Sequence, residues 1–138
     1  MNEVEKAESL ALEAVELVDA STSWVVPVFS AFKDLADRSK ADAALEAINK
    51  AAAEQQVPPK VELIVKSLLG DIDGAMQVAQ MLEAPGEAFE MDLLFISDLK
   101  ALREHPEFIP LMTRLGVTRY WQSEGCIFTV EKIACPTR

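Results

Sequence analysis

The side chains that most often perform chemistry are rare in this chain, which holds two cysteines, Cys126 and Cys135, and one histidine, His105. A disulfide between the cysteines would close a short loop and stabilise the fold by roughly 2–3 kcal/mol. It would suit a periplasmic or secreted setting, because the cytosol keeps thiols reduced. The alternative is two unconnected thiols, one or both buried, since spacing does not fix the geometry of a bridge. A zinc site needs more ligands than two cysteines and a distant histidine, so we expect no metal.

The single histidine has a catalytic and a structural interpretation. His105 could serve as a general base or as a pH switch. No nucleophile motif accompanies it, and it stands directly before Pro106 in the string Arg-Glu-His-Pro. We therefore interpret His105 as a residue at a helix boundary.

Glu87, Glu90 and Asp92 are three neighbouring carboxylates, and two carboxylates that lie close together could in principle perform acid–base chemistry. A chain with 23 acidic residues produces such clusters by chance. Glu87 and Glu90 also fall in the first turn of an expected helix, where the helix dipole favours negative charge. Gly70 and Gly74 flank a turn that lacks the lysine of a phosphate-binding loop. We expect a solvated acidic face, no catalytic residues, no cofactor and no enzymatic activity.

The large aromatic residues Trp24, Tyr120 and Trp121 are the candidates for contacts with a partner, because such side chains dominate binding hot spots. The competing interpretation is that they seal the ends of the hydrophobic core. Tyr120 and Trp121 follow Gly116 closely, and this position favours packing back onto the preceding helices.

The charge balance excludes several classes of partner. The chain has 138 residues, a net charge of −10 and a sequence pI near 4.5. A protein that binds nucleic acid neutralises phosphates with lysine and arginine, so we expect no nucleic-acid partner. An anionic membrane surface is disfavoured for the same reason.

No targeting or membrane-spanning segment is expected. The start, residues 1–6, is acidic where a signal peptide would be basic. The most hydrophobic run, residues 24–32, contains Pro27 and is too short to cross a bilayer. These features predict a cytoplasmic protein, or a periplasmic one if the chain is part of a longer membrane-anchored protein.

Apolar residues recur at helical spacing along most of the chain and predict about seven main helices. The third helix is expected to start at a Ser39 cap, and the helix over 87–103 to be central and buried on several sides. In the first helix, one buried stripe is expected, formed by Val4, Ala7, Leu10, Ala11, Ala14, Leu17 and Val18. The expected helices cover residues 3–19, about 21–37, 39 to about 52, 61–69, 72–82, 87–103 and 106–115.

We expect residues 1–138 to form a single domain, and the breaks between the helices divide it into three parts. Pro58-Pro59 is the clearest break, and the single turn at Gly70 should pair the helices on either side of it antiparallel. The resulting parts are N-terminal hairpins (1–56), C-terminal hairpins (59–121) and a cysteine-bearing tail (122–138). Alternation of apolar and polar residues at 128–131 predicts that this tail is short and extended.

The sequence Gly70-Asp71-Ile72-Asp73-Gly74-Ala75 is similar to the turn of tetratricopeptide-like helical hairpins. Three further features are a Pro-x-Phe helix at 106–108, a Leu115-Gly116 turn and a Tyr120-Trp121 pair. With them, the string from Leu69 to Trp121 resembles the C-terminal tetratricopeptide-like region of bacterial multidomain signalling proteins. Those proteins are of the adenylate cyclase or winged-helix transcriptional activator type. His105 stands where that pattern usually has a capping aspartate, the chain continues to Arg138, and no strict 34-residue repeat is legible.

The resemblance implies an all-α fold of stacked antiparallel helix hairpins in a right-handed superhelix. It also implies a non-catalytic protein-interaction or sensory module of a regulatory system, which binds a peptide or partner protein on a helical groove, and a chain that is a fragment or descendant of a longer protein. One alternative is a small-molecule-binding domain with a pocket between Met91, Phe95 and Phe108. A helical enzyme using its acidic residues is a further alternative.

Overall fold

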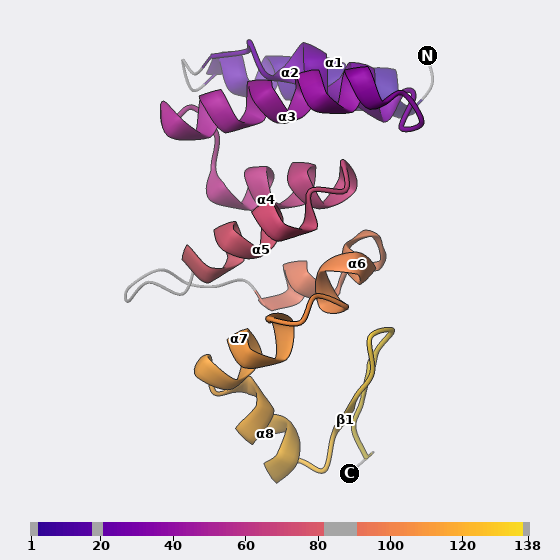
Figure 1. Ribbon diagram of the computed structural model, residues 1–138, viewed down its shortest axis with the longest axis vertical. Helices are drawn as coiled ribbons and strands as arrows, with labels where there is room; N and C mark the ends of the chain where they lie inside the picture. Colours follow the sequence, from indigo (N-terminus) through magenta and orange to yellow (C-terminus); the bar gives the residue numbers. More distant parts are fainter. Residues whose placement is uncertain (1–2, 18–20, 82–90, 137–138) are drawn as a thin grey trace. The chain divides into compact units, whose positions relative to one another are not determined.

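The computed structural model describes residues 3–17, 21–81 and 91–136, although the side chains of Met91 and Asp92 lie outside this description. The chain divides into an N-terminal unit, Met1–Asp71, and a C-terminal unit, Ile72–Arg138. The described residues are mostly helical, with a small two-stranded hairpin near the C-terminus (Figure 1). The expectation of a helical fold is confirmed at this level. The superhelix and the three-part division of the domain stay predictions.

The N-terminal unit consists of four helices that pack pairwise in chain order, and Figure 1 shows the first three side by side. Its core forms around Ala31, Ala44 and Ile48, each 0% exposed, with Trp24 at 5%. The third helix contributes the buried alanines Ala41, Ala44 and Ala51, whose small side chains allow close packing of helices. The four helices are α1 (Glu3–Leu17), α2 (Val25–Phe32), α3 (Arg38–Ala53) and α4 (Pro59–Leu68).

The first helix buries a different side from the one that its sequence predicts. Leu10 is 57% exposed and Leu17 is 82% exposed, whereas Leu12 and Val15 pack against the core. The inner side also carries Glu8, whose carboxylate pairs with Lys33 of the neighbouring helix end at 2.6 Å. Of the expected stripe, Ala11 also packs against the core, while Leu10 and Leu17 face solvent. No residue of α1 is fully buried.

Helix starts follow from proline and carboxylate positions. Pro27 lies in the first turn of α2 and Pro59 opens α4, positions where a missing N–H costs little. The cap of α3 is Asp37 rather than Ser39, because the Asp37 side chain accepts the backbone N–H of Ser39 at 3.0 Å and of Lys40 at 3.3 Å. A helix-capping residue needs an extended backbone and a short side chain that accepts hydrogen bonds from the unpaired N–H groups of the first turn. Asp37 has both.

Two helices of the N-terminal unit end in the same hydrogen-bond motif. After α4, Gly70 has φ +84° and the N–H of Asp71 reaches back to the carbonyl of Lys66 at 2.9 Å. After α3, Gln55 takes the equivalent left-handed position with φ 57°, and the N–H of Gln56 donates to Ala51 at 2.8 Å. This is the Schellman arrangement, in which glycine is preferred. Gln55 occupies it at a steric cost.

The C-terminal unit contains shorter elements. Contacts join α5 to α6, α7 to α8, and α8 to the first strand of the hairpin. Because α4 and α5 belong to different units, the antiparallel pairing expected across Gly70 stays a prediction. The elements are α5 (Ile72–Met81), the 3₁₀ helices η1 (Met91–Phe95) and η2 (Ser97–Leu99), α6 (Lys100–Arg103), α7 (Phe108–Arg114), α8 (Val117–Ser123), β1 (Ile127–Phe128) and β2 (Ile133–Ala134).

The prediction of one continuous helix over 87–103 is wrong for its described part. Ile96 is extended, with ψ 149°, and separates η1 from η2. The guanidinium of Arg103 donates to the carbonyls of Leu94 and Ile96 at 2.8 Å, so it takes over acceptors that a continuous α-helix would pair internally. Residues 87–90 lie outside the described part.

The end of the chain forms a helix and a hairpin. Gly116, with φ +78°, separates α7 from α8, and α8 is a helix that the sequence pattern did not predict. In the tail, β1 pairs antiparallel with β2, with Phe128 opposite Ile133. Backbone hydrogen bonds between Thr129 and Lys132, at 2.8 and 3.2 Å, close the turn. The extended tail is therefore a hairpin.

Candidate functional site

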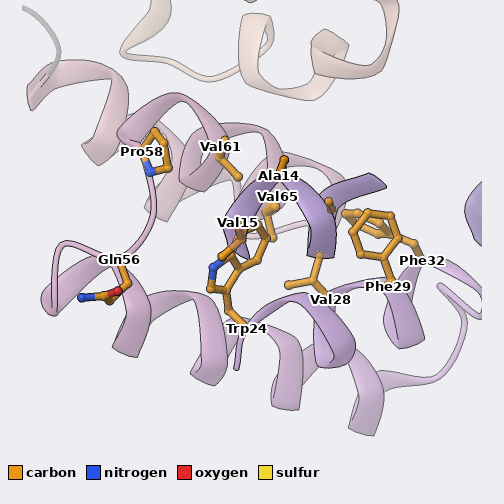
Figure 2. Close-up of a pocket in the computed structure, with 11 residues that line it drawn as sticks. Ala14, Val15, Trp24, Val28, Phe29, Phe32, Gln56, Pro58, Val61 and Val65 are labelled. Atoms are coloured by element: carbon orange, nitrogen blue, oxygen red, sulfur yellow. The ribbon is translucent and has the colours of Figure 1, made fainter. Parts of the chain in front are cut away.

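A cavity of about 380 Å³ lies in the N-terminal unit between α1, α2 and the start of α4. Its walls come from three helices that are adjacent in this unit, and Figure 2 shows the ring of Trp24 among the lining side chains. Ala14 and Pro58 are exposed, so the cavity reaches the surface along its rim. The lining residues are Ala11, Ala14, Val15, Trp24, Val28, Phe29, Phe32, Gln56, Pro58, Val61 and Val65.

The lining of this cavity is almost wholly apolar. It includes no ionisable side chain, and Gln56 contributes its only side-chain amide. That amide is already engaged, since its Oε1 accepts the backbone N–H of Ser21 at 2.9 Å and its Nε2 lies 3.4 Å from the carbonyl of Glu54. Walls of this kind can hold an apolar group but offer no acid, base or nucleophile for a reaction.

Trp24 is the exception in this apolar wall. Its side chain lines the cavity and is 5% exposed. Its indole Nε1 is buried, and no acceptor among the described residues lies within hydrogen-bond distance of it. The indole nitrogen is a donor only, and leaving a buried donor unpaired costs about 1–3 kcal/mol. Trp24 thus packs in the core with its indole nitrogen unpaired, and other atoms of its ring line the cavity.

The exposed side of α1 borders this cavity. Ala7, Leu10, Ala14 and Leu17 recur at helical spacing, and we call these four residues the outer stripe. Ala14 belongs both to the outer stripe and to the cavity lining. The helix is acidic as well as apolar, because its sequence EVEKAESLALEAVEL contains five glutamates and one lysine, a net charge of −4. An unpartnered apolar stripe on an acidic helix is the most prominent surface feature of this unit.

The other two aromatic candidates lie in the C-terminal unit, and the structure places them differently. Trp121 is buried at 7% exposure and stacks on Phe128, with ring centroids 5.0 Å apart and an interplanar angle of 2°. Tyr120 is 61% exposed. Both line a second cavity of about 380 Å³. Contact with a partner through any of the three aromatic residues stays a prediction.

Two of the three residues of the expected pocket, Phe95 and Phe108, contact each other, and the pocket itself stays a prediction. Phe108 is fully buried, and its ring meets Phe95 edge to face with centroids 6.2 Å apart. The cavity that Phe95 lines lies toward Tyr120 and Trp121 instead. The side chain of Met91, the third residue of that expected pocket, lies outside the described residues.

Cys126 and Cys135 form a disulfide in the structure, with Cα atoms 4.0 Å apart. The strand register brings the two cysteines together, because each lies next to one member of the paired residues Ile127 and Ala134. The bridge closes the hairpin at the end opposite its turn. It therefore holds Phe128 against the aromatic cluster of Trp121 and Phe108.

Two cations of α6 hold the turn of the hairpin. Arg103, 5% exposed, donates from Nε to the carbonyl of Val130 at 2.7 Å. Lys100 Nζ lies 2.7 Å from a carboxylate oxygen of Glu131. This hydrogen bond lowers the pKa of Glu131 and raises the pKa of Lys100, since each partner stabilises the charged form of the other.

His105 is part of a helix boundary, as its place before proline suggested. Its Nδ1 accepts the backbone N–H of Glu107 at 3.1 Å, and its Nε2 lies 3.0 Å from Asp73 Oδ1. If Nδ1 accepts, the neutral ring carries its proton on Nε2 and donates to Asp73. The imidazole therefore bonds the residue that caps α7, Glu107, and not a donor within the helix.

The remaining chemical candidates are the three neighbouring carboxylates. Glu87 and Glu90 lie outside the described residues, as does the side chain of Asp92. Across the part of the chain that is described, no three histidine, cysteine or carboxylate side chains are grouped so that they could hold a metal ion. In residues 3–17, 21–81 and 91–136, no helix has both the length and the apolar character needed to span a membrane.

No family model, curated protein or solved structure matches this chain.

Sequence reasoning missed the N-terminal cavity and the outer stripe. The cavity gathers residues from positions 11 to 65, which no local pattern connects. One signal was present in the run Trp24–Phe32, where Trp24, Val28 and Phe32 recur every four residues and Phe29 lies beside them. That spacing places several bulky side chains on one face of a short helix.

Proposed function

We propose that this chain is a non-catalytic protein-interaction module of a bacterial signalling system, with the outer stripe of α1 as its docking surface. The observation that carries the proposal is the exposure of Leu10 and Leu17, at 57% and 82%, on a helix with no fully buried residue. The tetratricopeptide-like character and the superhelix belong to the same proposal, and they rest on the resemblance over residues 69–121.

The partner that fits this surface is a basic amphipathic helix. Its apolar side chains would cover Leu10 and Leu17, removing two large aliphatic groups from water. Its lysines or arginines would face the glutamates of α1, whose net charge is −4. Helix-in-groove docking with apolar anchors every three or four residues is a common mode of peptide recognition. The net charge of −10 would also speed the encounter with a basic partner.

Binding of a synthetic amphipathic helix of leucine and lysine tests the proposal. We expect the labelled peptide to bind the full chain in a fluorescence anisotropy titration. The double variant Leu10→Glu/Leu17→Glu should bind at least about tenfold more weakly, because two apolar contacts are lost. A peptide with glutamate in place of lysine should not bind.

A matched control separates packing from charge. Ala43→Glu/Asn49→Glu adds the same two negative charges at exposed positions of α3. It should bind the basic peptide at least as tightly as the unaltered chain. If both double variants bind the peptide equally well, the attraction is electrostatic alone and the outer stripe is not a docking surface.

A further inference from the structure

We propose that the partner helix on the outer stripe carries a phenylalanine whose ring enters the cavity between α1, α2 and α4. The proposal rests on the docking function proposed above and deepens it, because it names the side chain that anchors the partner. Three properties of the N-terminal unit carry it: the continuity of the outer stripe with the cavity, the apolar lining of the cavity and its size.

The outer stripe and the cavity meet at Ala14. This residue lies between Leu10 and Leu17 on the exposed side of α1, and its side chain also lines the cavity. Residues three and four positions apart are neighbours on a helix surface, so a partner that covers both leucines passes directly over Ala14. Only a methyl group stands there, and Pro58 is exposed at the same rim. A side chain of the partner that lies between its two leucine contacts therefore faces the mouth of the cavity.

The lining admits an apolar side chain and disfavours a polar one. No ionisable side chain is among the lining residues, and the amide of Gln56 is engaged by Ser21 at 2.9 Å and by Glu54 at 3.4 Å. A lysine or glutamate from the partner would lose its hydration without gaining a charged neighbour. The hydroxyl of a tyrosine would lose its hydrogen bonds to water in the same way. The benzyl group of phenylalanine carries no polar atom, so it avoids both costs.

The walls and the volume of the cavity suit an aromatic ring. Trp24, Phe29 and Phe32 line it, and the rings of Phe29 and Phe32 already meet edge to face, with centroids 5.7 Å apart and an interplanar angle of 78°. Aromatic rings attract one another in such arrangements. The volume of about 380 Å³ admits about a dozen non-hydrogen atoms, at ~30 Å³ for each. A benzyl group fits within this space and fills more of it than a leucine side chain does.

A series of peptides tests the anchor. Three leucine–lysine helices differ only at one central position of their apolar face, which holds phenylalanine, tyrosine or alanine. In fluorescence anisotropy titrations of the full chain, the phenylalanine peptide should bind at least about tenfold more tightly than the alanine peptide, because a whole ring leaves water. It should also bind at least about fivefold more tightly than the tyrosine peptide, because a buried hydroxyl goes unpaired.

Valine methyl resonances locate the ring. Val28, Val61 and Val65 line the cavity, whereas Val130 belongs to the hairpin of the C-terminal unit. In a chain with labelled valine methyl groups, the phenylalanine peptide should shift the resonances of the three lining valines through its ring current. The alanine peptide should shift them much less. Val130 serves as the reference and should not move with either peptide.

Filling the cavity should abolish the preference for phenylalanine. Ala11→Phe places a ring in the cavity from α1, so the phenylalanine and alanine peptides should bind this variant with equal affinity. Ala43→Phe adds the same ring at an exposed position of α3 and should keep the preference. If Ala11→Phe does not fold, the peptide series and the valine resonances of the unaltered chain decide.

Failure of this inference and failure of the docking proposal give different results. Equal affinity of the phenylalanine and alanine peptides, with stationary valine resonances, would overturn the inference, and so would a tyrosine peptide that binds as tightly as the phenylalanine peptide. In either case, weaker binding by Leu10→Glu/Leu17→Glu would still support the outer stripe as a docking surface. Binding that is unaffected by Leu10→Glu/Leu17→Glu, or no binding of any peptide, would contradict the docking surface and the inference with it.

Discussion

At the scale of single residues, Arg103 shows how one side chain can redirect a backbone. It is 5% exposed and makes three hydrogen bonds, to the carbonyls of Leu94, Ile96 and Val130. A guanidinium can make these bonds at once because its donors form a rigid fork. The same side chain interrupts an expected helix and holds the turn of the hairpin.

Arg103→Met should therefore destabilise the C-terminal unit by about 2–3 kcal/mol, since the carbonyls of Leu94 and Val130 lose the donor that Arg103 supplies, and the carbonyl of Ile96 keeps only the N–H of Leu99 at 3.2 Å. Urea denaturation followed by far-UV circular dichroism measures this change. Arg119→Met, at an exposed position, should alter the free energy of unfolding by less than about 0.5 kcal/mol. Equal effects of the two variants would show that the buried hydrogen bonds contribute nothing specific.

At the scale of elements, helix ends determine where the chain can turn. The helices α3 and α4 end in the same motif, one with Gln55 and the other with Gly70 in the left-handed position. After α8, Gly125 has φ +69°, and the N–H of Cys126 reaches back to Trp121 at 2.7 Å. Glycine was visible in the sequence at two of these ends. At Gln55 only the following proline pair signalled a break.

Gln55→Gly should stabilise the chain by about 0.5–1 kcal/mol, because it relieves a left-handed conformation that costs a side-chain-bearing residue roughly 1–2 kcal/mol. Gly70→Ala is the reciprocal control. A Cβ there would meet no atom within 4 Å, so its loss of about 1 kcal/mol would come from the backbone alone. Chemical denaturation measures both. A destabilised Gln55→Gly would contradict the assignment of strain.

The disulfide makes a prediction for the hairpin as an element. Removing it, as Cys126→Ser/Cys135→Ser or by reduction, should lower the free energy of unfolding by about 2–3 kcal/mol. The near-UV circular dichroism should weaken as well, because Phe128 would be less firmly held against Trp121. A reducing agent should leave the double variant unchanged. If it alters that variant, the effect of reduction does not come from this bond.

Local patterns predicted most helices but not which faces they bury. Periodicity and prolines located α1, α3, α4, α5 and α7 closely, because these signals act within a few residues. The second helix, expected over about 21–37, is only half as long, because α2 covers Val25–Phe32. On α1 two apolar faces overlap at Ala11, and contacts with residues distant in sequence, which bury Leu12 and Val15 rather than Leu10 and Leu17, are not visible in the local pattern. The broken segment before Arg103 depends on hydrogen bonds to residues seven to 27 positions away in sequence. The cavity around Trp24 depends on the packing of three helices.

At the scale of the whole molecule, the chain is strongly acidic and consists of two helical units. The described residues include an apolar cavity in the N-terminal unit and an exposed apolar side of α1. The proposed docking of a partner depends on the second of these features. Affinity for a basic partner should fall as salt is added, since exposed charges are screened, and the apolar part of the affinity should persist.

The most direct measurement of the central claim is hydrogen exchange of the full chain with and without the amphipathic leucine–lysine peptide. Amides of α1 should exchange readily in the free chain, because that helix has no fully buried residue. The account predicts that the peptide slows exchange within residues 3–17 and leaves residues 108–136 unchanged. Slower exchange confined to the C-terminal unit, or no change anywhere, would contradict it.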